Sequence, residues 1–460
     1  MRDVRIPQSY QQRHLSEQPS RRLGYSEGEH TFLQGVQPMS DPVSRRSLVK
    51  SAAAVAAPAV VPARAASDQV TFGVIGTGGR GYYLMQRLYV GSGKNVRILS
   101  VCDTYQGNLN RAKDRVQTMG ANTPTTHVDY TELLANKDIN TVIIATPEHL
   151  HHVMTIAALK AGKNVYIEKP LAHTIEEGEE ILAVARQAGK LVQVGTQNRS
   201  NSLYGMAKQM ISQGMIGDCH YVRAFWYRNA IAGGIPAWRY AIPKDTNEQN
   251  TDWNRFLGPA PKRAFDKQRY FQWRLYWDYS GGISTDLLVH QTDITNFVLG
   301  KTVPNTCMAS GGVYRWTEND DRDVPDTLSA LYDYEDKFHL NYSCYLGNDQ
   351  FGYGEQFCGN EGTIEVTNRQ VLQFWPQKAG TPPAPIGDRK EVRIELPGND
   401  NLAVEAHLRN LVQAVQGKAS LVAPVEVGQQ AAISGHLATL SFRNNKKVIW
   451  NDKTRKYTFA

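Results

Sequence analysis

The sequence predicts an α/β protein in which a doubly wound parallel sheet is followed by an α+β domain with a mostly antiparallel sheet. Between Gln69 and about Gly195, short apolar runs alternate with helical stretches, the pattern of repeated β–α units. Beyond residue 305 the strands alternate apolar and polar residues, which indicates a sheet with one packed and one exposed face. We therefore expect a leader at 1–66, a first domain at 67–196 and a second domain at 197–460.

The first predicted strand, Val70–Val74, runs into a glycine-rich turn with G-x-G-x-x-G spacing, and a helix at Tyr82–Val90 follows. In such a turn the glycines allow a tight bend and close approach of the backbone to a pyrophosphate, which sits at the N-terminus of the helix. The first domain is therefore predicted to be a dinucleotide-binding Rossmann domain. The cofactor-binding residues expected in this turn are Gly76, Gly78, Gly79, Arg80 and Gly81, the last of which lets the helix pack close to the strand.

An acidic residue, Asp103, ends the second predicted strand, Val96–Cys102. A carboxylate at this point accepts hydrogen bonds from the ribose hydroxyls of the adenosine half of the cofactor. It would also repel a 2′-phosphate, so the sequence favours NAD, with NADP as the alternative. Arg111, eight residues further on, is the residue that would favour NADP.

The other elements follow from the same periodicities. Further strands of the first domain are expected at Thr141–Thr146, Asn164–Ile167 and Leu191–Val194, with helices at Gly107–Met119, His151–Ala161 and Ile175–Ala188. Residues 225–280 read as an aromatic, loop-like stretch. Strands of the second domain are expected at Thr327–Tyr334, Lys337–Cys344 and Gly362–Val366.

Charge and cysteine content exclude some classes of protein. The formal net charge is +7, but the leader holds much of it, and no Lys/Arg run stands out in the remainder. The sequence therefore gives little support to nucleic-acid binding. The five cysteines form no C-x-x-C pair, so neither a disulfide framework nor a thiolate zinc site is indicated.

The sequence predicts an export signal in the leader. Ser44-Arg45-Arg46-Ser47-Leu48 matches a twin-arginine motif, an Ala/Val-rich run follows at Ser51–Val61, and Ala63-Arg64-Ala65 is a small-x-small cleavage site. The apolar run is shorter than the roughly 20 residues of a membrane span, so no stable anchor is expected. We predict export by the twin-arginine machinery to the periplasm or beyond, with Met39 as an alternative start to Met1.

Two short segments carry residues suited to alcohol oxidation. Glu168-Lys169-Pro170 ends a predicted strand, where ligands of open α/β sheets bind. Asp286 and His290 are four residues apart, and share a helix face if Ser284 or Thr285 caps a helix there. An imidazole oriented by a carboxylate, with an ammonium nearby, can take a hydroxyl proton and stabilise the alkoxide. The alternative is a surface helix pair and a solvated lysine.

Taken in order, these motifs resemble those of the glucose–fructose oxidoreductase / inositol dehydrogenase (Gfo/Idh/MocA) family, over about residues 69–460. The resemblance rests on the glycine turn, Thr146-Pro147 with His149 and His152, Glu168-Lys169-Pro170, and Asp286-x-x-x-His290. It implies catalytic roles for Lys169, Asp286 and His290. It also implies cofactor contacts from Thr146, Pro147, His149, Glu168 and Lys169. The family usually has Gly two residues before the His, where this chain has Leu288.

The remaining expectations concern the substrate. A sugar could bind Lys169, Arg199, Trp226, Arg228, Arg274, Trp277, Asp286 and His290, although aromatics at such density are equally typical of a packed loop. No metal is expected, because nothing completes a ligand set around His149, His151 and His152.

The resulting hypothesis is an exported NAD(P)-dependent oxidoreductase acting on a hydroxyl of a sugar, polyol or glycoside. Its cofactor would be retained, because no exchangeable pool exists outside the cytoplasm, and it would form a homo-oligomer through the second sheet. One alternative is an NAD-dependent glycosidase acting by transient oxidation and elimination, although the resemblance implies that those relatives lack this Glu168-Lys169-Pro170. The other is a non-catalytic sugar or nucleotide sensor, which would not require a base.

Overall fold

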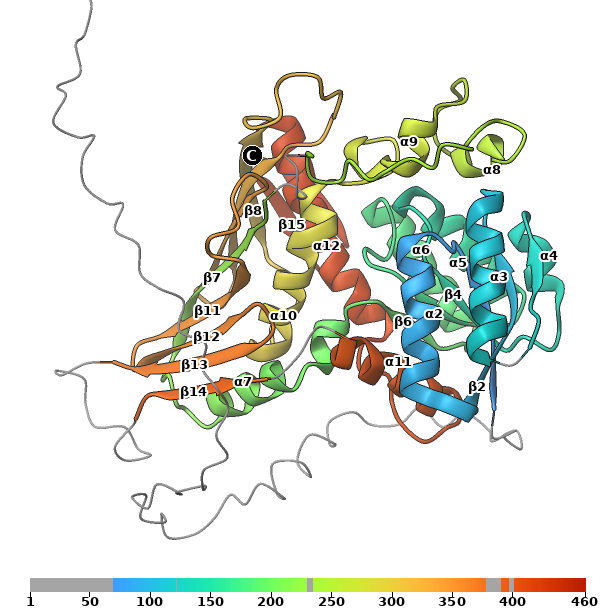
Figure 1. The fold of residues 1–460 in the computed structure, drawn as a ribbon. Coiled ribbons are helices and arrows are strands. Elements are labelled where there is room, and N and C mark those ends of the chain that lie inside the picture. The colour runs from blue at the N-terminus through green and yellow to red at the C-terminus, as the bar shows by residue number, and fades with distance from the viewer. Residues whose placement is uncertain (1–68, 121, 230–234, 378–389, 397–400) are drawn as a thin grey trace, which may run out of the picture. The chain divides into compact units, whose positions relative to one another are not determined.

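The structure, a computed structural model, describes residues 69–120, 122–229, 235–377, 390–396 and 401–460. The twin-arginine motif and the cleavage site lie outside the described residues. Within the described residues the strands form two sheets, one of six strands and one of ten (Figure 1).

The six-stranded sheet is parallel throughout, in the order β3-β2-β1-β4-β5-β6. Its strands are β1 (Val70–Ile75), β2 (Val96–Cys102), β3 (Thr125–His127), β4 (Thr141–Ile144), β5 (Asn164–Ile167) and β6 (Val192–Val194). The order reverses between β1 and β4, and ligands of such sheets bind at the carboxyl ends of the strands at this point. The predicted Rossmann fold is confirmed.

Helices cover both faces of this sheet. They are α2 (Gly79–Ser92), the short η3 (Gly93–Asn95), α3 (Gln106–Gly120), α4 (Tyr130–Ala135), α5 (His151–Lys160) and α6 (Ile175–Ala188). Helices α2 and α3 share one apolar core, and α4, α5 and α6 share the core on the opposite face. Helix α6 has the predicted bounds because Thr174 and Glu177 form a capping box and Gly189 ends the helix at φ 59°.

The second sheet has the order β14-β13-β12-β11-β7-β10-β9-β8-β15-β16. Its strands are β7 (Cys219–Tyr227), β8 (Thr306–Gly312), β9 (Thr327–Tyr334), β10 (Phe338–Tyr345), β11 (Tyr353–Gly359), β12 (Gly362–Thr367), β13 (Val371–Pro376), β14 (Val392–Glu395), β15 (Val448–Asn451) and β16 (Lys456–Phe459). Only the β7–β10 pair is parallel among the described pairs. The prediction of a mostly antiparallel second sheet is confirmed.

One face of the second sheet is packed and the other is open. The longer helices after the Rossmann sheet are α7 (Ser202–Ser212), α10 (Val289–Leu299), α11 (Asn401–Val415) and α12 (Val425–Asn444). Figure 1 shows α10 and α12 on one side of the sheet, and the Tyr332 hydroxyl donates to the Ser434 carbonyl of α12 at 2.7 Å. On the opposite face Met308 and Leu331 pair directly across β8 and β9 and are 39% and 42% exposed.

Helix α11 returns to the first sheet, although it follows the second sheet in the chain. Val404 and Leu408 belong to the same apolar core as α2 and α3. Arg87 of α2 pairs with Glu405 at 3.0 Å. The predicted domain boundary at residue 196 stays a prediction, but this helix shares its core with the domain before that boundary.

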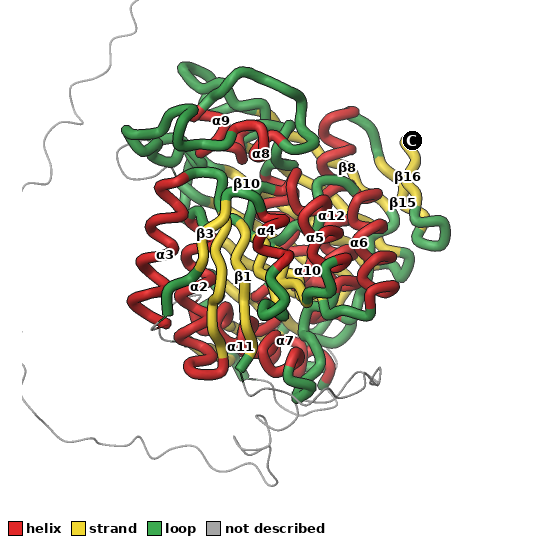
Figure 2. Tube along the Cα trace, turned by 90° about the vertical axis from the view of Figure 1, so that its right-hand side faces the viewer, coloured by secondary structure: helices red, strands yellow, loops and turns green. Residues whose placement is uncertain are grey.

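Residues 240–276 form a segment that we call the strap. It contains α8 (Trp253–Leu257), α9 (Lys267–Phe271) and η6 (Trp273–Leu275), and both views show it beside the carboxyl ends of the parallel strands (Figures 1 and 2). The backbone joins it to the first domain, since Asp252 N donates to Thr104 O at 2.7 Å and Gln106 N donates to Asn250 O at 2.9 Å. Much of its aromatic content packs within it, as in the stacked Trp253–Phe256 pair at 5.1 Å.

Candidate active site

A cavity of about 1070 Å³ lies at the carboxyl ends of the parallel strands. It is lined on one side by the glycine-rich turn and the residues after β1, β4 and β5, and on the other by the strap and the second sheet. Its volume is at the upper end of the range of cofactor and ligand pockets. The cavity can therefore hold a dinucleotide and leave room for a small substrate.

The glycine-rich turn fits a pyrophosphate through its backbone. Gly76 has φ +84°, and a Cβ there would lie 2.8 Å from the backbone of Ala145. A Cβ on Gly81 would lie 1.9 Å from the carbonyl oxygen of Gly76, so α2 approaches β1 as closely as a glycine permits. Gly78 caps α2 without a side chain, and a Cβ on Gly79 would meet nothing within 4 Å. The open N-terminus of α2 is thus suited to an anion.

Asp103 lines the cavity beyond the end of β2. Its carboxylate accepts from Thr77 N at 2.7 Å, from Tyr105 N at 3.0 Å and from the hydroxyl of Tyr270 in the strap at 3.1 Å. Burial raises the pKa of Asp103, and these donors oppose the rise. The side chain is where a ribose is expected, and the preference for NAD stays a prediction. Arg111 also lines the cavity and its guanidinium lies 4.7 Å from the ring of Tyr82.

The three predicted catalytic residues meet in the same cavity. Lys169 follows β5, Asp286 lies in the π-helical turn η7 (Ser284–Leu288), and His290 is in the first turn of α10. Lys169 Nζ donates to Asp286 Oδ1 at 2.8 Å, and both side chains are 11% exposed. These residues come from different parts of the chain, and only the fold brings them together.

Asp286 differs from the expectation in its partners. Its Oδ1 accepts from Lys169 Nζ and from Arg274 Nε, at 2.8 and 3.1 Å, and not from the imidazole of His290. Burial would raise the pKa of Asp286, but the charges of Lys169 and Arg274 outweigh it and hold the pKa well below its ordinary value. The expectation that Asp286 orients His290 is therefore corrected. Asp286 anchors two cations.

The expected helix cap is also absent, because η7 runs into α10 without an N-cap side chain. Ser284 Oγ donates to Gly281 O at 3.0 Å. Thr285 Oγ1 donates to the buried carboxylate of Glu148, in η4 (Glu148–Leu150), at 2.9 Å. The two hydroxyls that were predicted to cap a helix therefore form other hydrogen bonds within the protein.

His290 is held as a neutral imidazole. Its pKa lies well below the ordinary value because the ring is buried, and the charge of Lys169 lowers it further. Nδ1 is buried without a hydrogen-bond partner, and the ring stacks on Trp226 at 6.1 Å between centroids. Nε2 is the ring nitrogen left to reach a ligand. A neutral imidazole beside an ammonium can accept a proton.

Six of the eight residues expected to bind substrate line the cavity, the three catalytic residues among them, and two do not. Trp226, Arg228 and Arg274 line it. Arg199 instead pairs with the buried Asp293 at 2.8 Å. Trp277 packs against Phe442 of α12, with ring centroids 6.3 Å apart. Arg199 and Trp277 are therefore corrected to structural positions, because internal partners hold both side chains away from the cavity.

The expected cofactor contacts divide in the same way. Thr146, Pro147 and Glu168 line the cavity, and Glu168 pairs with Arg80 at 2.8 Å. His149 does not line it. Its ring is buried and bonds through Nε2 to the carbonyl of Phe256 in the strap at 2.8 Å. Burial lowers the pKa of His149 to about 3. We therefore correct His149 to a neutral residue that supports the strap.

The sequence did not reveal several residues that line the cavity. Tyr270 lies in the strap, and Tyr353 stacks on Trp226 at 4.6 Å. Arg369 sits in the turn between β12 and β13 at φ 57°, with its guanidinium 5.2 Å from the same Trp226 ring. Nothing local predicts that this turn reaches the site. Gln197, in η5 (Gln197–Ser200), could have been found, because it follows the end of β6.

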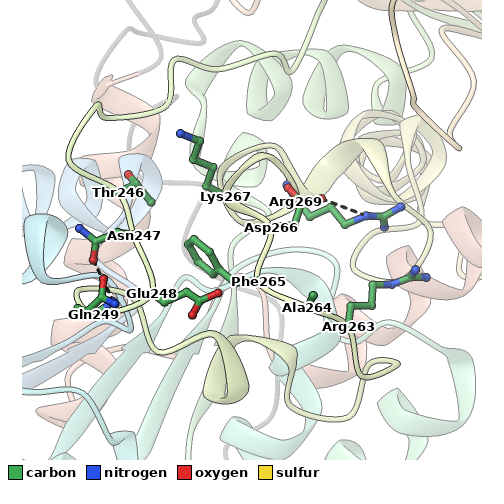
Figure 3. A pocket seen from close by; sticks show the side chains of 10 residues that line it. All are labelled: Thr246, Asn247, Glu248, Gln249, Arg263, Ala264, Phe265, Asp266, Lys267 and Arg269. Atoms are coloured by element: carbon green, nitrogen blue, oxygen red, sulfur yellow. Dashed lines mark hydrogen bonds and ion pairs between the residues drawn. The ribbon is translucent and has the colours of Figure 1, made fainter.

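A second hollow, of about 740 Å³, lies outside the catalytic cavity. Figure 3 shows its lining from two segments of the strap, residues 246–249 and residues 263–269, the second of which runs into α9. Phe265 points into it, and Asp266 and Arg269 pair at 3.8 Å. None of the expected catalytic, cofactor or substrate residues lines this hollow.

Two kinds of site are absent from the described part of the chain. No cluster of three or more His, Cys, Asp or Glu side chains there could hold a metal ion. None of the described helices is both long and apolar enough to span a bilayer.

A parallel sheet with a glycine-rich turn, closed by a second domain that contributes an Asp and a His, defines a two-domain nucleotide-binding oxidoreductase. The chain belongs to the Gfo/Idh/MocA oxidoreductase family. Residues 70–196 match its NAD-binding Rossmann-fold domain, and residues 250–449 match its C-terminal alpha/beta domain. The family resemblance seen in the sequence is confirmed.

Three similar proteins illustrate the range of the family. Over 235 residues the chain is 29% identical to scyllo-inositol 2-dehydrogenase (NAD(+)) of Bacillus subtilis (strain 168), covering 51% of this chain and 55% of that protein. Over 159 residues it is 31% identical to a glycosyl hydrolase family 109 protein of Shewanella baltica (strain OS155), covering 33% of each. The chain thus spans about half or less of these relatives. A levoglucosan dehydrogenase structure with NADH and levoglucosan has TM-score 0.64 at 18% identity, covering 83% of this chain and 99% of that one, a likeness of fold.

Proposed function

We propose that the protein is an NAD-dependent dehydrogenase acting on a hydroxyl or keto group of a sugar, polyol or glycoside. The observation that carries this proposal is that Lys169, Asp286 and His290 line the same cavity as the glycine-rich turn. Oxidation of an alcohol needs a base for the hydroxyl proton, a cation for the developing alkoxide and an adjacent hydride acceptor. One cavity with these three features suits that reaction class.

The side chains divide the work as follows. NAD, when bound, supplies the acceptor for the hydride that leaves the carbon. His290 Nε2 accepts the hydroxyl proton, because burial keeps its ring neutral. The ammonium of Lys169 stabilises the negative charge on the substrate oxygen, and Asp286 holds that ammonium in place at 2.8 Å. In the reverse direction His290 returns the proton to the oxygen.

The test is a panel of sugars, polyols and glycosides, followed by the absorbance of reduced nicotinamide and by the mass of the product. The proposal expects at least one substrate to reduce the cofactor and to yield a product lighter by two hydrogens. A His290→Ala variant run on the same panel is the control for a contaminating dehydrogenase. Substrate binding without cofactor reduction would contradict the proposal and favour a sensor.

A second candidate function is an NAD-dependent glycosidase, because the chain is 31% identical over 159 residues to a glycosyl hydrolase family 109 protein. Transient oxidation at one carbon acidifies the neighbouring C–H, so the glycosidic bond can be eliminated and the cofactor regenerated. Chromogenic glycosides separate the two candidates. Release of the aglycone without net cofactor reduction would favour the glycosidase.

We also propose that the protein acts outside the cytoplasm and keeps its cofactor bound. Twin-arginine signals direct proteins that are already folded, so the nicotinamide would be bound in the cytoplasm and exported with the chain. The strap supports retention, because its Tyr270 hydroxyl donates to Asp103, the residue expected at the ribose. Bound cofactor would add about 2.7 kcal/mol of stability at a hundred times its dissociation constant. Near-stoichiometric nicotinamide in mature protein purified without added nucleotide would support retention, and an empty site would contradict it.

The open face of the second sheet supports a homo-oligomer. Met308 and Leu331 pair across neighbouring strands on that face, and Ile449 of β15 is 40% exposed. Exposed apolar side chains grouped on one sheet face are typical of protein interfaces. A Leu331→Lys variant should lower the mass measured by light scattering if this face joins two copies. An unchanged oligomer would place the interface elsewhere.

A further inference from the structure

The cavity carries an excess of positive charge. Seven basic side chains and four carboxylates line it. The glycine-rich turn and Arg80 belong to the cofactor end, where Glu168 pairs with Arg80 at 2.8 Å. At the catalytic end the carboxylate of Asp286 is shared by two cations, Lys169 at 2.8 Å and Arg274 at 3.1 Å. Asp286 can therefore balance only one of these two positive charges.

The guanidinium of Arg274 is oriented for an anion. It uses Nε to hold Asp286 and lies 4.2 Å from the ring of Trp273. Its two terminal amino groups donate to no acceptor among the described residues, and its side chain is 23% exposed at the cavity. Two parallel N–H donors match the two oxygens of a carboxylate or of a phosphate.

A second cation lies in the same half of the cavity. Arg228 follows the end of β7, and its guanidinium lies 5.7 Å from the ring of Trp226, which in turn stacks on His290. No carboxylate of the described residues pairs with Arg228. Glu148 also lines this half, but Ser280, Gly281 and Thr285 already donate to its buried carboxylate.

We propose that the substrate is an anionic sugar, which carries a carboxylate or a phosphate in addition to the hydroxyl that reacts. The terminal amino groups of Arg274 would hold its anionic oxygens, and Arg228 would add a second positive charge. The reacting hydroxyl would then reach His290 and Lys169. This inference rests on the proposed function for the identity of the site, and its test separates the two.

The test compares matched ligands in binding and in turnover, on the full protein with its nicotinamide bound. Suitable sets are glucose, glucuronate and glucose 6-phosphate, and galactose, galacturonate and galactose 6-phosphate. In the best set, an anionic member should bind roughly 10- to 100-fold more tightly than its neutral parent, the scale of a hydrogen bond to a charged group. The carboxylate and phosphate members show which anion is preferred. Added salt should weaken anionic ligands more than neutral ones.

Variants locate the effect. Arg274→Gln should abolish the preference, and Arg274→Lys should restore part of it, because the charge returns without the paired donors. Arg228→Gln should reduce it by a smaller factor while leaving the Asp286 contacts in place. Arg97→Gln is the matched control, because Arg97 is exposed on β2 and does not line the cavity.

The outcomes separate the two proposals. Neutral sugars that bind as tightly as their anionic partners, or a preference that survives Arg274→Gln, would overturn the inference even if the protein oxidises sugars. A preference for anions without cofactor reduction would overturn the proposed dehydrogenase and leave the anion site standing.

Discussion

The two ends of the cavity are formed by different parts of the protein, one by backbone and the other by charged side chains. At the cofactor end the contacts come from one short segment of backbone, in which Gly76 and Gly81 have no room for a Cβ. At the catalytic end they come from charged side chains of separate elements, since Lys169 follows β5, Asp286 lies in η7 and Arg274 lies in η6. The first end depends on chain geometry and the second on charge. Substitutions at one end should therefore leave the other end working.

The largest expected effect is at the catalytic end. His290→Ala and Lys169→Ala should each lower turnover by at least ~10²-fold, the usual scale for a positioned proton-transfer group. Affinity for NADH, measured by fluorescence titration, should stay close to that of the native protein. Near-native turnover in the His290 variant would contradict its role as the base, and loss of NADH binding would break the separation of the two ends.

Gly81→Ala should act at the cofactor end and weaken the binding of NADH. The new Cβ would lie 1.9 Å from the Gly76 carbonyl oxygen, and such overpacking costs about 1–3 kcal/mol. Thermal unfolding should show a less stable protein with roughly 10- to 100-fold weaker NADH binding, on the same energy scale. Gly205→Ala in α7 is the control, because a Cβ there meets nothing within 4 Å. Equal behaviour of the two variants would show that Gly81 is not a close-packing position.

The pH dependence should reflect the lowered pKa of His290. Burial disfavours the imidazolium, so the ring stays neutral as the pH falls through the ordinary histidine pKa of about 6.5. kcat/KM should therefore stay constant between pH 8 and pH 5.5. Protonation of a histidine with the ordinary pKa would lower kcat/KM roughly 10-fold at pH 5.5. Circular dichroism at pH 5.5 separates protonation from unfolding. A loss centred near pH 6.5 in folded protein would contradict the assignment.

The smallest expected effect is on the release of NADH, and it comes from a tyrosine in the strap. Tyr270→Phe removes a hydroxyl that bonds to Asp103 at 3.1 Å, which is worth about 1 kcal/mol. Release of NADH, followed by stopped-flow fluorescence, should become roughly 5-fold faster on the same scale. Tyr276→Phe, at the end of the strap, removes a hydroxyl that bonds to Asp321 at 2.9 Å and does not line the cavity, so it should leave the release rate unchanged. Equal release rates in both variants would show that the strap does not hold the cofactor.

The same contrast explains what could be predicted from sequence. The glycine turn and Asp103 lie within 28 residues in one β–α–β unit, so local spacing was enough to place them. Strand β2, Val96–Cys102, and helix α6, Ile175–Ala188, have the predicted bounds because periodicity and caps are local. The short β3 and α4 were missed because three and six residues carry little periodic signal.

Long-range partners could not be predicted. The spacing of Asp286 and His290 suggested a pair, whereas Asp286 binds Lys169, which is 117 positions away in the chain. Arg199 was expected at the substrate, but it binds Asp293. This partner lies 94 positions away in the chain, so the sequence around Arg199 gave no sign of it. The return of α11 to α2 joins segments 318 positions apart, at Arg87 and Glu405. Such contacts depend on the whole fold, and no local pattern encodes them.

Tracing the hydride shows directly whether it moves from the substrate to the nicotinamide. A substrate found on the panel would be prepared with deuterium on the reacting carbon and mixed with the protein and NAD. After denaturation, mass spectrometry would locate the label. With the native protein we expect the deuterium on the nicotinamide in stoichiometric amount, and we expect His290→Ala to slow its arrival by at least ~10²-fold. Label found in the solvent or retained on the sugar, with the cofactor still oxidised, would contradict hydride transfer in this cavity.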